Sequence, residues 1–279
     1  MNKLPMSKRV AVVSALVEGN SIRATSRMTD VSKPTILKLL ADLGEACAAF
    51  HETNVKGVRA GRVQCDEIWQ FVYCKQKNVP EAQEGTFGFG DVWTWTALDA
   101  DSKLIVSYLV GPRTPSMAYE LMKDLASRIV GKPQITTDGL YWYPHAVEHA
   151  FGIDVDYAVQ TKNFADSKAG RYSPGRFTGS TKEVIRGNPD PKHISTSFVE
   201  RQNLSMRMGM RRFTRLSNGF SKKVENHAHA VALYFLHYNF ARIHKTLRVT
   251  PAMAAGLADH VWGLEEIVGL LDRANAVAA

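Results

Sequence analysis

This sequence of 279 residues lacks the features that define several whole classes of proteins. No apolar run reaches the roughly 18 residues that a membrane-spanning helix needs, and the N-terminal segment MNKLPMSKRV has no apolar stretch like that of a signal peptide. Cysteine is scarce, since Cys47, Cys65 and Cys74 are odd in number, lie far apart and form no CxxC motif. These absences argue against a membrane protein, a disulfide framework and a zinc knuckle, and they favour a reducing cytoplasm.

Motifs of hydrolases and dinucleotide-binding enzymes are missing as well. No GxSxG stands in the chain, and no cysteine lies in a plausible nucleophile elbow. The GFGD at residues 88–91 lies in an expected loop, whereas a dinucleotide site needs a strand before it and a helix after it. The sequence has no internal repeat or low-complexity tract, so we expect an ordinary globular chain.

What the sequence does contain is positive charge gathered in one region. The net charge is +8, but residues 162–223 hold 14 Lys and Arg against 4 Asp and Glu, a local charge of +10. Everything outside this window therefore sums to −2. Such a concentration of cations is typical of a surface that binds a polyanion, and it predicts a nucleic-acid partner.

The N-terminal residues 7–43 have the pattern of three short helices, with a tight turn before the third. This order is typical of a helix-turn-helix, although short three-helix stretches also occur as plain packing units. We expect a DNA-binding domain at residues 1–50, followed by a polar linker at 51–62. The residues expected to meet DNA open the third helix and are Ser32, Lys33, Thr35 and Lys38.

Residues 63–216 combine strands and helices in a particular order. Strands are expected at 62–74, 92–100, 103–111, 133–140 and 154–160, with helices at 116–131 and 141–152 between the later strands and another at 196–215. This order predicts an α/β fold with a ribonuclease-H-like mixed β-sheet. Residues 161–194 are rich in glycine, proline and cations, and we expect them to form an irregular basic insertion. A helical region at 217–279 completes the chain.

Three acids fall at informative places in this order. Asp66 lies in mid-strand, where β propensity disfavours it, so it is either a buried structural residue or a ligand. Asp138 ends a short buried strand, and Glu200 begins the late helix. Three carboxylates on adjacent elements can hold two hard cations roughly 3.5–4 Å apart for phosphodiester chemistry. Glu67 is expected on the opposite side of its strand, in a structural role.

The late helix places one acid among many cations. On a helix, Glu200, Asn203, Arg207 and Arg211 would share one face, which suits holding a metal ion against a phosphate. A solvated basic helix with one ion pair is the alternative. The residues of this region expected to bind DNA are Asn203, Arg207, Arg211, Arg212, Arg215, Lys222 and Lys223.

Sequence segments around all three acids resemble one known family. They are CDEIW at 65–69, TTDG at 136–139, FVERQNLSMRMGMRRFTR at 198–215 and FSKKVENHAHAV at 220–231, and the tail YNFARIHKTLRVTPAMAAGL at 238–257 fits too. Over about residues 60–250 the chain resembles DDE transposases of bacterial insertion sequences, of the InsB type. The chain lacks the N-terminal zinc-binding cysteine cluster of many relatives, so recognition of element ends would rest on the helix-turn-helix.

The resemblance implies a function and a set of partners. Asp66, Asp138 and Glu200 would be catalytic and bind Mg²⁺, with Mn²⁺ as a substitute, and Arg207 would contact DNA as the basic residue seven positions after the glutamate. The protein would cleave double-stranded DNA at the terminal inverted repeats of its element and join the ends to target DNA. It would act as a homodimer or larger assembly, without a membrane, in the bacterial cytoplasm at the nucleoid. A structure-selective ribonuclease-H-like nuclease and a domesticated DNA-binding regulator without catalysis are the alternatives.

Overall fold

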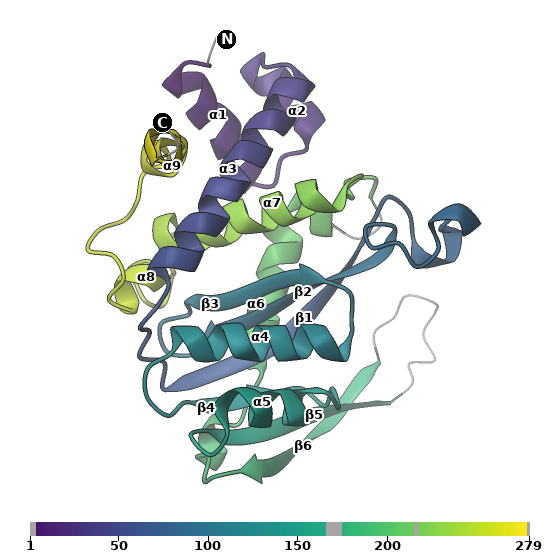
Figure 1. The fold of residues 1–279 in the computed structure, drawn as a ribbon, viewed down its shortest axis with the longest axis vertical. Helices are drawn as coiled ribbons and strands as arrows, with labels where there is room; N and C mark the ends of the chain where they lie inside the picture. The colour runs from purple at the N-terminus through teal and green to yellow at the C-terminus, as the bar shows by residue number, and fades with distance from the viewer. Residues whose placement is uncertain (1–3, 166–174, 215–216, 278–279) are drawn as a thin grey trace.

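The computed structural model describes residues 4–165, 175–214 and 217–277 (Figure 1). Its strands are β1 (Arg62–Val72), β2 (Gly90–Asp99), β3 (Ile105–Gly111), β4 (Gln134–Thr137), β5 (Asp156–Ala165) and β6 (Arg176–Arg186). Its α-helices are α1 (Met6–Val17), α2 (Ile22–Thr29), α3 (Lys33–Asn54), α4 (Pro115–Arg128), α5 (Tyr143–Phe151), α6 (Ser197–Gly209), α7 (Val224–Leu236), α8 (Pro251–Ala254) and α9 (Leu264–Val277). Short 3-10 turns are η1 (Gln76–Asn78), η2 (Glu81–Gln83), η3 (Pro191–His193) and η4 (Arg211–Phe213), and α7 runs on into a π-helical turn, η5 (His237–Ala241).

The strands form one mixed sheet with the order β3-β2-β1-β4-β5-β6. The pairs β1–β4 and β4–β5 are parallel, whereas β1–β2, β2–β3 and β5–β6 are antiparallel. The predicted α/β class and mixed sheet are confirmed. Each connection into a parallel strand contains a helix, which is how parallel strands are joined.

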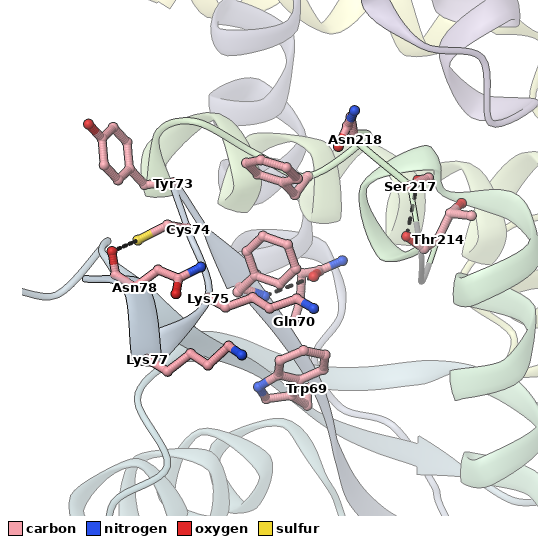
Figure 2. Close-up of a pocket in the computed structure, with 12 residues that line it drawn as sticks. Trp69, Gln70, Tyr73, Cys74, Lys75, Lys77, Asn78, Thr214, Ser217 and Asn218 are labelled. Carbon is pink, nitrogen blue, oxygen red and sulfur yellow. Dashed lines mark hydrogen bonds between the residues drawn. The ribbon is translucent and has the colours of Figure 1, made fainter. Parts of the chain in front are cut away.

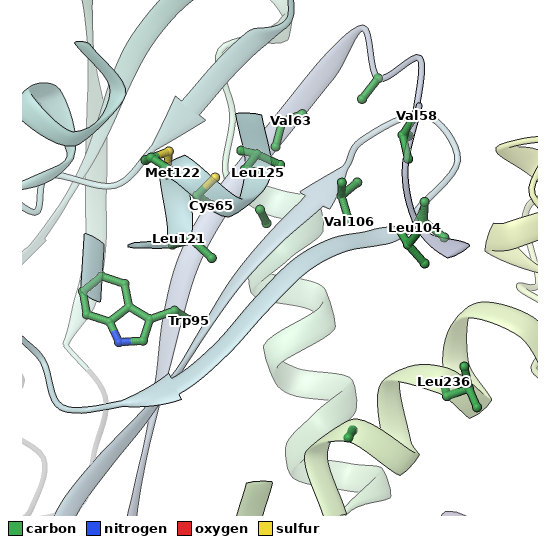
Figure 3. Packing of buried hydrophobic residues seen from close by; sticks show 14 of the residues in the cluster. Val58, Val63, Cys65, Trp95, Leu104, Val106, Leu121, Met122, Leu125 and Leu236 are labelled. Atoms are coloured by element: carbon green, nitrogen blue, oxygen red, sulfur yellow. The ribbon is translucent and has the colours of Figure 1, made fainter. Parts of the chain in front are cut away.

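Helices cover both faces of the sheet (Figure 1). On one face, α4 and α5 pack on buried side chains that include Cys65 and Trp95, and Figure 3 shows Trp95 and Cys65 beside Leu121 and Met122 of α4. On the other face, α6 and α7 form a separate cluster that includes Ile68 and Leu98 of the sheet. The two faces follow from strand alternation, because neighbouring side chains on β1 point in opposite directions.

The predicted irregular insertion at 161–194 is wrong at residues 161–165 and 176–186, which are strands, whereas residues 187–194 are irregular apart from η3. β5 continues to Ala165, and β6 pairs with it from Arg176 to Arg186. Glycine and proline at the flanks of this segment suggested a loop, but its centre carries the β-formers Thr181, Val184 and Ile185. Backbone pairing with β5 makes this stretch an edge strand. Residues 166–174 of the predicted insertion lie outside the described residues.

The three N-terminal helices occur where the sequence predicts them, but the third is far longer than expected. Helix α3 has 22 residues and ends at Asn54, inside the predicted linker 51–62. Gly44, a plausible helix end in the sequence, instead lies in the middle of α3 where it crosses α7. A Cβ atom at Gly44 would stand 2.6 Å from the Cα of His229, so the crossing needs a residue without a side chain.

The N-terminal helices share their core with the rest of the chain. Val13 of α1 and Leu43 of α3 belong to the same buried cluster as Val63 of β1 and Ile267 of α9. Figure 1 shows α9 lying beside α1 and α3. The N-terminal helices are therefore packed against the C-terminal helices. The connection to the sheet is residues 55–61, shorter than the predicted linker 51–62, and it buries Val55, Val58 and Ala60 in the same core.

Candidate active site

The register of two parallel strands brings two of the predicted acids together. Cys65 of β1 pairs with Thr137 of β4, so the residues that follow, Asp66 and Asp138, stand next to each other where β4 ends. The carboxyl ends of parallel strands are the usual place for ligands in such sheets. Beyond Cys65, no strand that the structure describes pairs with the same edge of β1 until Val72 forms an isolated bridge with Ser221.

The Asp66 carboxylate is held from two sides. Its Oδ1 accepts a hydrogen bond from the backbone N–H of Glu67 at 2.8 Å. Its Oδ2 accepts one from Nδ2 of Asn203 on α6, also at 2.8 Å. Asp138 is fixed locally, because its Oδ1 accepts a hydrogen bond from the backbone N–H of Leu140 at 3.1 Å. Helix α6 therefore touches the strand acids directly through Asn203.

Glu67 joins these two acids, which the sequence analysis did not anticipate. One carboxylate oxygen each from Asp66, Glu67 and Asp138 lie within 4.8 Å of one another. Glu67 also has the structural contacts expected of it, because its Oε1 accepts hydrogen bonds from Nε (2.8 Å) and Nη2 (2.6 Å) of Arg113. The Tyr143 hydroxyl donates to Oε2 at 3.1 Å. Glu67 is thus a buried acid with a fixed cationic partner at the border of the cluster.

All three clustered carboxyls have raised pKa values. Burial, followed by the charges of Glu67, Asp138 and Glu200, raises the pKa of Asp66 to about 8. Burial also raises the pKa of Asp138, with the charge of Glu200 adding to the effect. The pKa of Glu67 is raised by burial and by Asp138, against the opposing effect of Arg113. Crowded carboxyls that resist losing their protons are typical of a site built for a cation.

Glu200 borders the cluster from α6 without lying inside it. Its Oε1 accepts a hydrogen bond from the Thr196 hydroxyl at 2.7 Å, and its Oε2 pairs with the ammonium group of Lys162 on β5. The charge of Glu200 nevertheless raises the pKa values of Asp66 and Asp138. The structure therefore brings Asp66 and Asp138 together, places Glu200 beside them and holds it with a lysine.

The donors present fit a hard divalent cation. Carboxylate oxygens are the ligands that Mg²⁺ and Mn²⁺ prefer, and two acids from parallel strand ends supply them here. Asn203 is 9% exposed, and among the described residues nothing forms a hydrogen bond with its Oδ1. A buried amide oxygen beside Asp66 without a partner is a further donor to a cation or to its bound water.

The structure separates the cations that were expected on one helix face. Asn203 and the half-buried Arg207 lie on α6 with Glu200, but the helix ends at Gly209. Arg211 therefore lies in η4 and does not continue the face, contrary to the prediction, and Arg212 lies beside it in the same turn. Phe213, which follows them, is fully buried in the cluster formed by α6 and α7.

Arg212 points into the protein. Its Nη1 donates to Oγ of Ser221 at 2.7 Å, and its backbone carbonyl accepts a hydrogen bond from the side chain of Gln70. Burial lowers the pKa of Arg212 to about 10. These contacts give Arg212 a structural role that the sequence analysis missed. Lys222 and Lys223 are exposed, Arg211 is exposed, and Arg215 lies outside the described residues.

The residues expected to meet DNA at the N-terminus lie at the start of α3. Ser32 caps the helix, with its Oγ accepting from the backbone N–H of Thr35 at 3.4 Å, and Lys33 is exposed. Lys38 forms an ion pair with Asp42 one turn further on, at 2.7 Å. DNA contact by these four residues stays a prediction.

Comparisons with known proteins give a limited result. No family model matches the chain, and no curated protein matches it. Among solved structures, the piggyBac transposase synaptic complex with hairpin DNA has a TM-score of 0.41 and 11% identity, covering 97% of this chain and 71% of that chain. The Mos1 strand transfer complex has a TM-score of 0.25 and 13% identity, covering 56% of this chain and 59% of that chain. The Mos1 paired-end complex with the left transposon end has a TM-score of 0.23 and 11% identity, covering 56% and 60%.

TM-scores of this size do not define a shared fold, and the function proposed below rests on the residues of the site. Among the described residues, no helix is long and apolar enough to cross a membrane.

Proposed function

We propose that this chain is a DNA transposase of the DDE type, which binds the ends of its own element and catalyses metal-dependent strand cleavage and strand transfer. The observation that carries the proposal is the register of β1 and β4, which sets Asp66 beside Asp138 at the ends of parallel strands. Glu200 on α6 adds its charge to theirs. The segment resemblances around these same three acids point to the same chemistry.

In this proposal Asp66, Asp138 and Glu200 hold two Mg²⁺ ions, with Mn²⁺ as a substitute. When bound, such a pair activates a water or a 3′-hydroxyl and stabilises the charge on the leaving oxygen. Asn203 orients the Asp66 carboxylate through its hydrogen bond. Arg113 and Tyr143 hold Glu67 and leave the other acids to the cations.

Lys162 is proposed to have two partners. In the structure its ammonium group pairs with Glu200. If Glu200 held a cation instead, Lys162 would be left to contact the phosphate of the substrate strand. Arg207, two turns along α6 from Glu200, is proposed to hold a neighbouring phosphate.

The proposed partners are double-stranded DNA and further copies of the chain. Ser32, Lys33, Thr35 and Lys38 would read the terminal inverted repeats, and the basic region would hold element and target DNA through phosphates. Two ends must be held together for strand transfer, so a homodimer or larger assembly is proposed. A bacterial insertion sequence of the InsB type, in the cytoplasm, is the proposed source.

The test is a donor plasmid whose marker lies between the DNA sequences that flank the encoding gene. Asp66→Asn, Asp138→Asn and Glu200→Gln should each reduce excision and joining to background while leaving folding and DNA binding intact. A double substitution should be hardly worse than a single one, because the three acids act as a unit. Glu225→Gln is the matched control, since Glu225 is an exposed acid on α7 and does not belong to the cluster.

The products of this assay separate the alternatives. Metal-dependent cuts without joined products would identify a nuclease, and binding without cuts would identify a regulator. The ligand set is tested by comparing Glu67→Gln with Glu200→Gln in Mn²⁺. Cleavage that survives in Glu200→Gln but is lost in Glu67→Gln would replace Glu200 by Glu67 in the metal site.

A further inference from the structure

A pocket of about 800 Å³ lies at the far end of β1, beyond the acid cluster. Its walls come from β1, from the segment that follows it through η1, and from the segment between η4 and α7 (Figure 2). The lining residues are Trp69, Gln70, Phe71, Tyr73, Cys74, Lys75, Lys77, Asn78, Thr214, Ser217, Asn218 and Phe220. This volume is in the range of sites that bind small molecules or single groups of a polymer.

Aromatic rings form one wall of this pocket. The ring centroids of Trp69 and Phe71 are 5.9 Å apart, and those of Phe71 and Phe220 are 4.7 Å apart with an interplanar angle of 42°. These three side chains are partly exposed, and Tyr73 at the rim is 46% exposed. Rings that keep exposed faces beside a cavity are platforms on which a flat group can stack.

Two lysines carry the charge among the lining residues that the structure describes, and most of the others are neutral and polar. Lys75 and Lys77 are exposed on the opposite wall, and Figure 2 shows their side chains extending across the pocket in the direction of Trp69. The Lys222 ammonium group lies 3.8 Å from the ring centroid of Phe220. None of the lining residues that the structure describes is acidic. This combination suits a ligand with a flat ring and a negative charge.

The pocket and the acid cluster lie on one strand. Trp69 follows Asp66 by three residues on β1, so a rise of about 3.3 Å per residue puts their Cα atoms roughly 10 Å apart, and strand alternation turns the two side chains to opposite faces. Trp69 shares its face with Glu67, whose carboxylate belongs to the acid cluster. Between them, the β4-facing edge of β1 pairs with no strand in the described part of the chain, because β4 ends beside Cys65. A DNA strand needs only a few nucleotide steps of roughly 3.4 Å to cover this distance.

We propose that this pocket binds an unpaired nucleobase of the DNA strand whose phosphate lies at the acid cluster. The base stacks on Trp69, Phe71 and Phe220, and Lys75 and Lys77 hold the adjoining phosphates. The inference rests on the proposed function, because a DNA-cutting site is what delivers a strand with an unpaired base to this place. Aromatic platforms edged by lysines are how proteins bind single-stranded DNA without reading its sequence.

The experiment measures the binding of two DNA duplexes to the full-length chain in the absence of divalent metal ions. One is a duplex with a single-stranded 3′ overhang that contains 2-aminopurine, whose fluorescence changes when it stacks, and the other is the same duplex with a blunt end. Trp69→Ala and Phe220→Ala should each weaken overhang binding about 10-fold and abolish the fluorescence change, with little effect on the blunt duplex. Trp69→Phe keeps a platform and should recover most of both.

Exposed residues provide the remaining variants. Lys75→Ala combined with Lys77→Ala removes no buried contact and should weaken overhang binding more than blunt binding. Phe87→Ala and Lys123→Ala are controls, because both side chains are exposed and lie outside the pocket.

Two outcomes would overturn the proposal. One is equal weakening of overhang and blunt binding, or no weakening, in the pocket variants. The other is a change of oligomeric mass in Trp69→Ala with overhang binding intact, which would assign the pocket to a second copy of the chain. Neither readout needs cleavage, so the proposed chemistry can fail while base binding holds, and the reverse.

Discussion

Asp66 is the carboxyl of the site whose pKa is affected by burial and by all three neighbouring acids. It accepts hydrogen bonds from Asn203 and from the Glu67 backbone, yet burial and three neighbouring acids still raise its pKa to about 8. Two hydrogen bonds to a carboxylate normally lower a pKa, so the net rise shows how strongly burial and like charge act here. A divalent cation held by these carboxylates would offset their mutual repulsion with its positive charge.

Asp66 should therefore make the metal-free protein less stable as the pH rises. Its folded pKa of about 8 lies above its ordinary value of 3.8, so the folded state binds the extra proton between these limits. The free energy of unfolding should fall across this window, by on the order of a few kcal/mol, relative to an Asp66→Asn variant that cannot titrate. Denaturant titrations of both proteins in a chelator, at several pH values, measure the difference.

The same denaturant titrations repeated with Mg²⁺ in place of the chelator test the role of the cation. At high pH the ion should restore stability to the wild-type protein and do less for Asp66→Asn. A wild-type protein whose stability relative to the variant does not change between pH 4 and 8 would contradict the raised pKa.

The sequence allowed some of these residues to be placed and not others. Asp66 and Asp138 could be predicted as neighbours, because strand order fixes which strand ends meet. Glu67 could not, because strand alternation puts it on the other face of β1 from Asp66. Lys162 could not, because it was expected in the irregular insertion and lies on β5 instead. The inward direction of Arg212 depends on where α6 ends, which the sequence pattern did not reveal.

At the scale of elements, the crossing of α3 and α7 decides how the N-terminal helices sit on the sheet. The two helices approach so closely at Gly44 that the backbone of His229 occupies the place of a side chain. On the far side of the crossing, α3 reaches β3, where Nε2 of His51 lies 3.1 Å from the carbonyl oxygen of Val106. The close crossing at Gly44 thus sets the position of α3 on α7, and His51 and the shared core join α3 to the sheet.

Gly44→Ala should destabilise the protein, although alanine favours helices. The new methyl group would meet the His229 backbone and force the two helices apart, at a cost of about 1–3 kcal/mol. Gly269→Ala is the matched control, because Gly269 is also helical and a Cβ there meets nothing within 4 Å. The control should be stabilised by up to about 1 kcal/mol. Thermal unfolding of both variants measures the contrast, and equal effects would contradict the close crossing.

Element types were easier to predict than element ends. The alternation of β1 and the 92–111 hairpin follow directly from local patterns, and so do α4 and α5. The length of α3 and the strand β6 depend on partners distant in sequence. Glycine is common at helix ends, so local propensity predicted that the third helix would end near Gly44. The residues that flank β6 favour loops, so local propensity predicted a loop there as well.

At the scale of the molecule, the N-terminal helices cannot be removed to test DNA recognition. Arg128 at the end of α4 is 3% exposed and donates to the backbone carbonyls of His51 (3.2 Å) and Val55 (3.1 Å). Deleting α3 would leave this guanidinium group without these partners and expose the shared core. Loss of end recognition in such a deletion would report unfolding, so surface substitutions are needed instead.

Exposed cations lie both at the start of α3 and on β6, and we expect the two places to contact DNA in different ways. Lys33 is exposed at the start of α3, and Arg176 is exposed on β6 within the strongly basic region. Lys33→Ala should reduce the preference for DNA that carries the element's ends over random DNA. Arg176→Ala should weaken both DNAs alike. Each phosphate contact that is lost should lower the slope of log affinity against log salt by about one.

Lys123 on α4 provides the control for both substitutions, because it is exposed and lies outside the basic region. Lys123→Ala should leave both affinities and the salt slope unchanged. The measurement is fluorescence anisotropy of labelled end and random duplexes over a series of salt concentrations. If Lys33→Ala weakens the two duplexes equally, α3 holds DNA without reading it, and end recognition must come from another surface. If it weakens neither, the N-terminal helices are a packing unit that completes the core against α7 and α9.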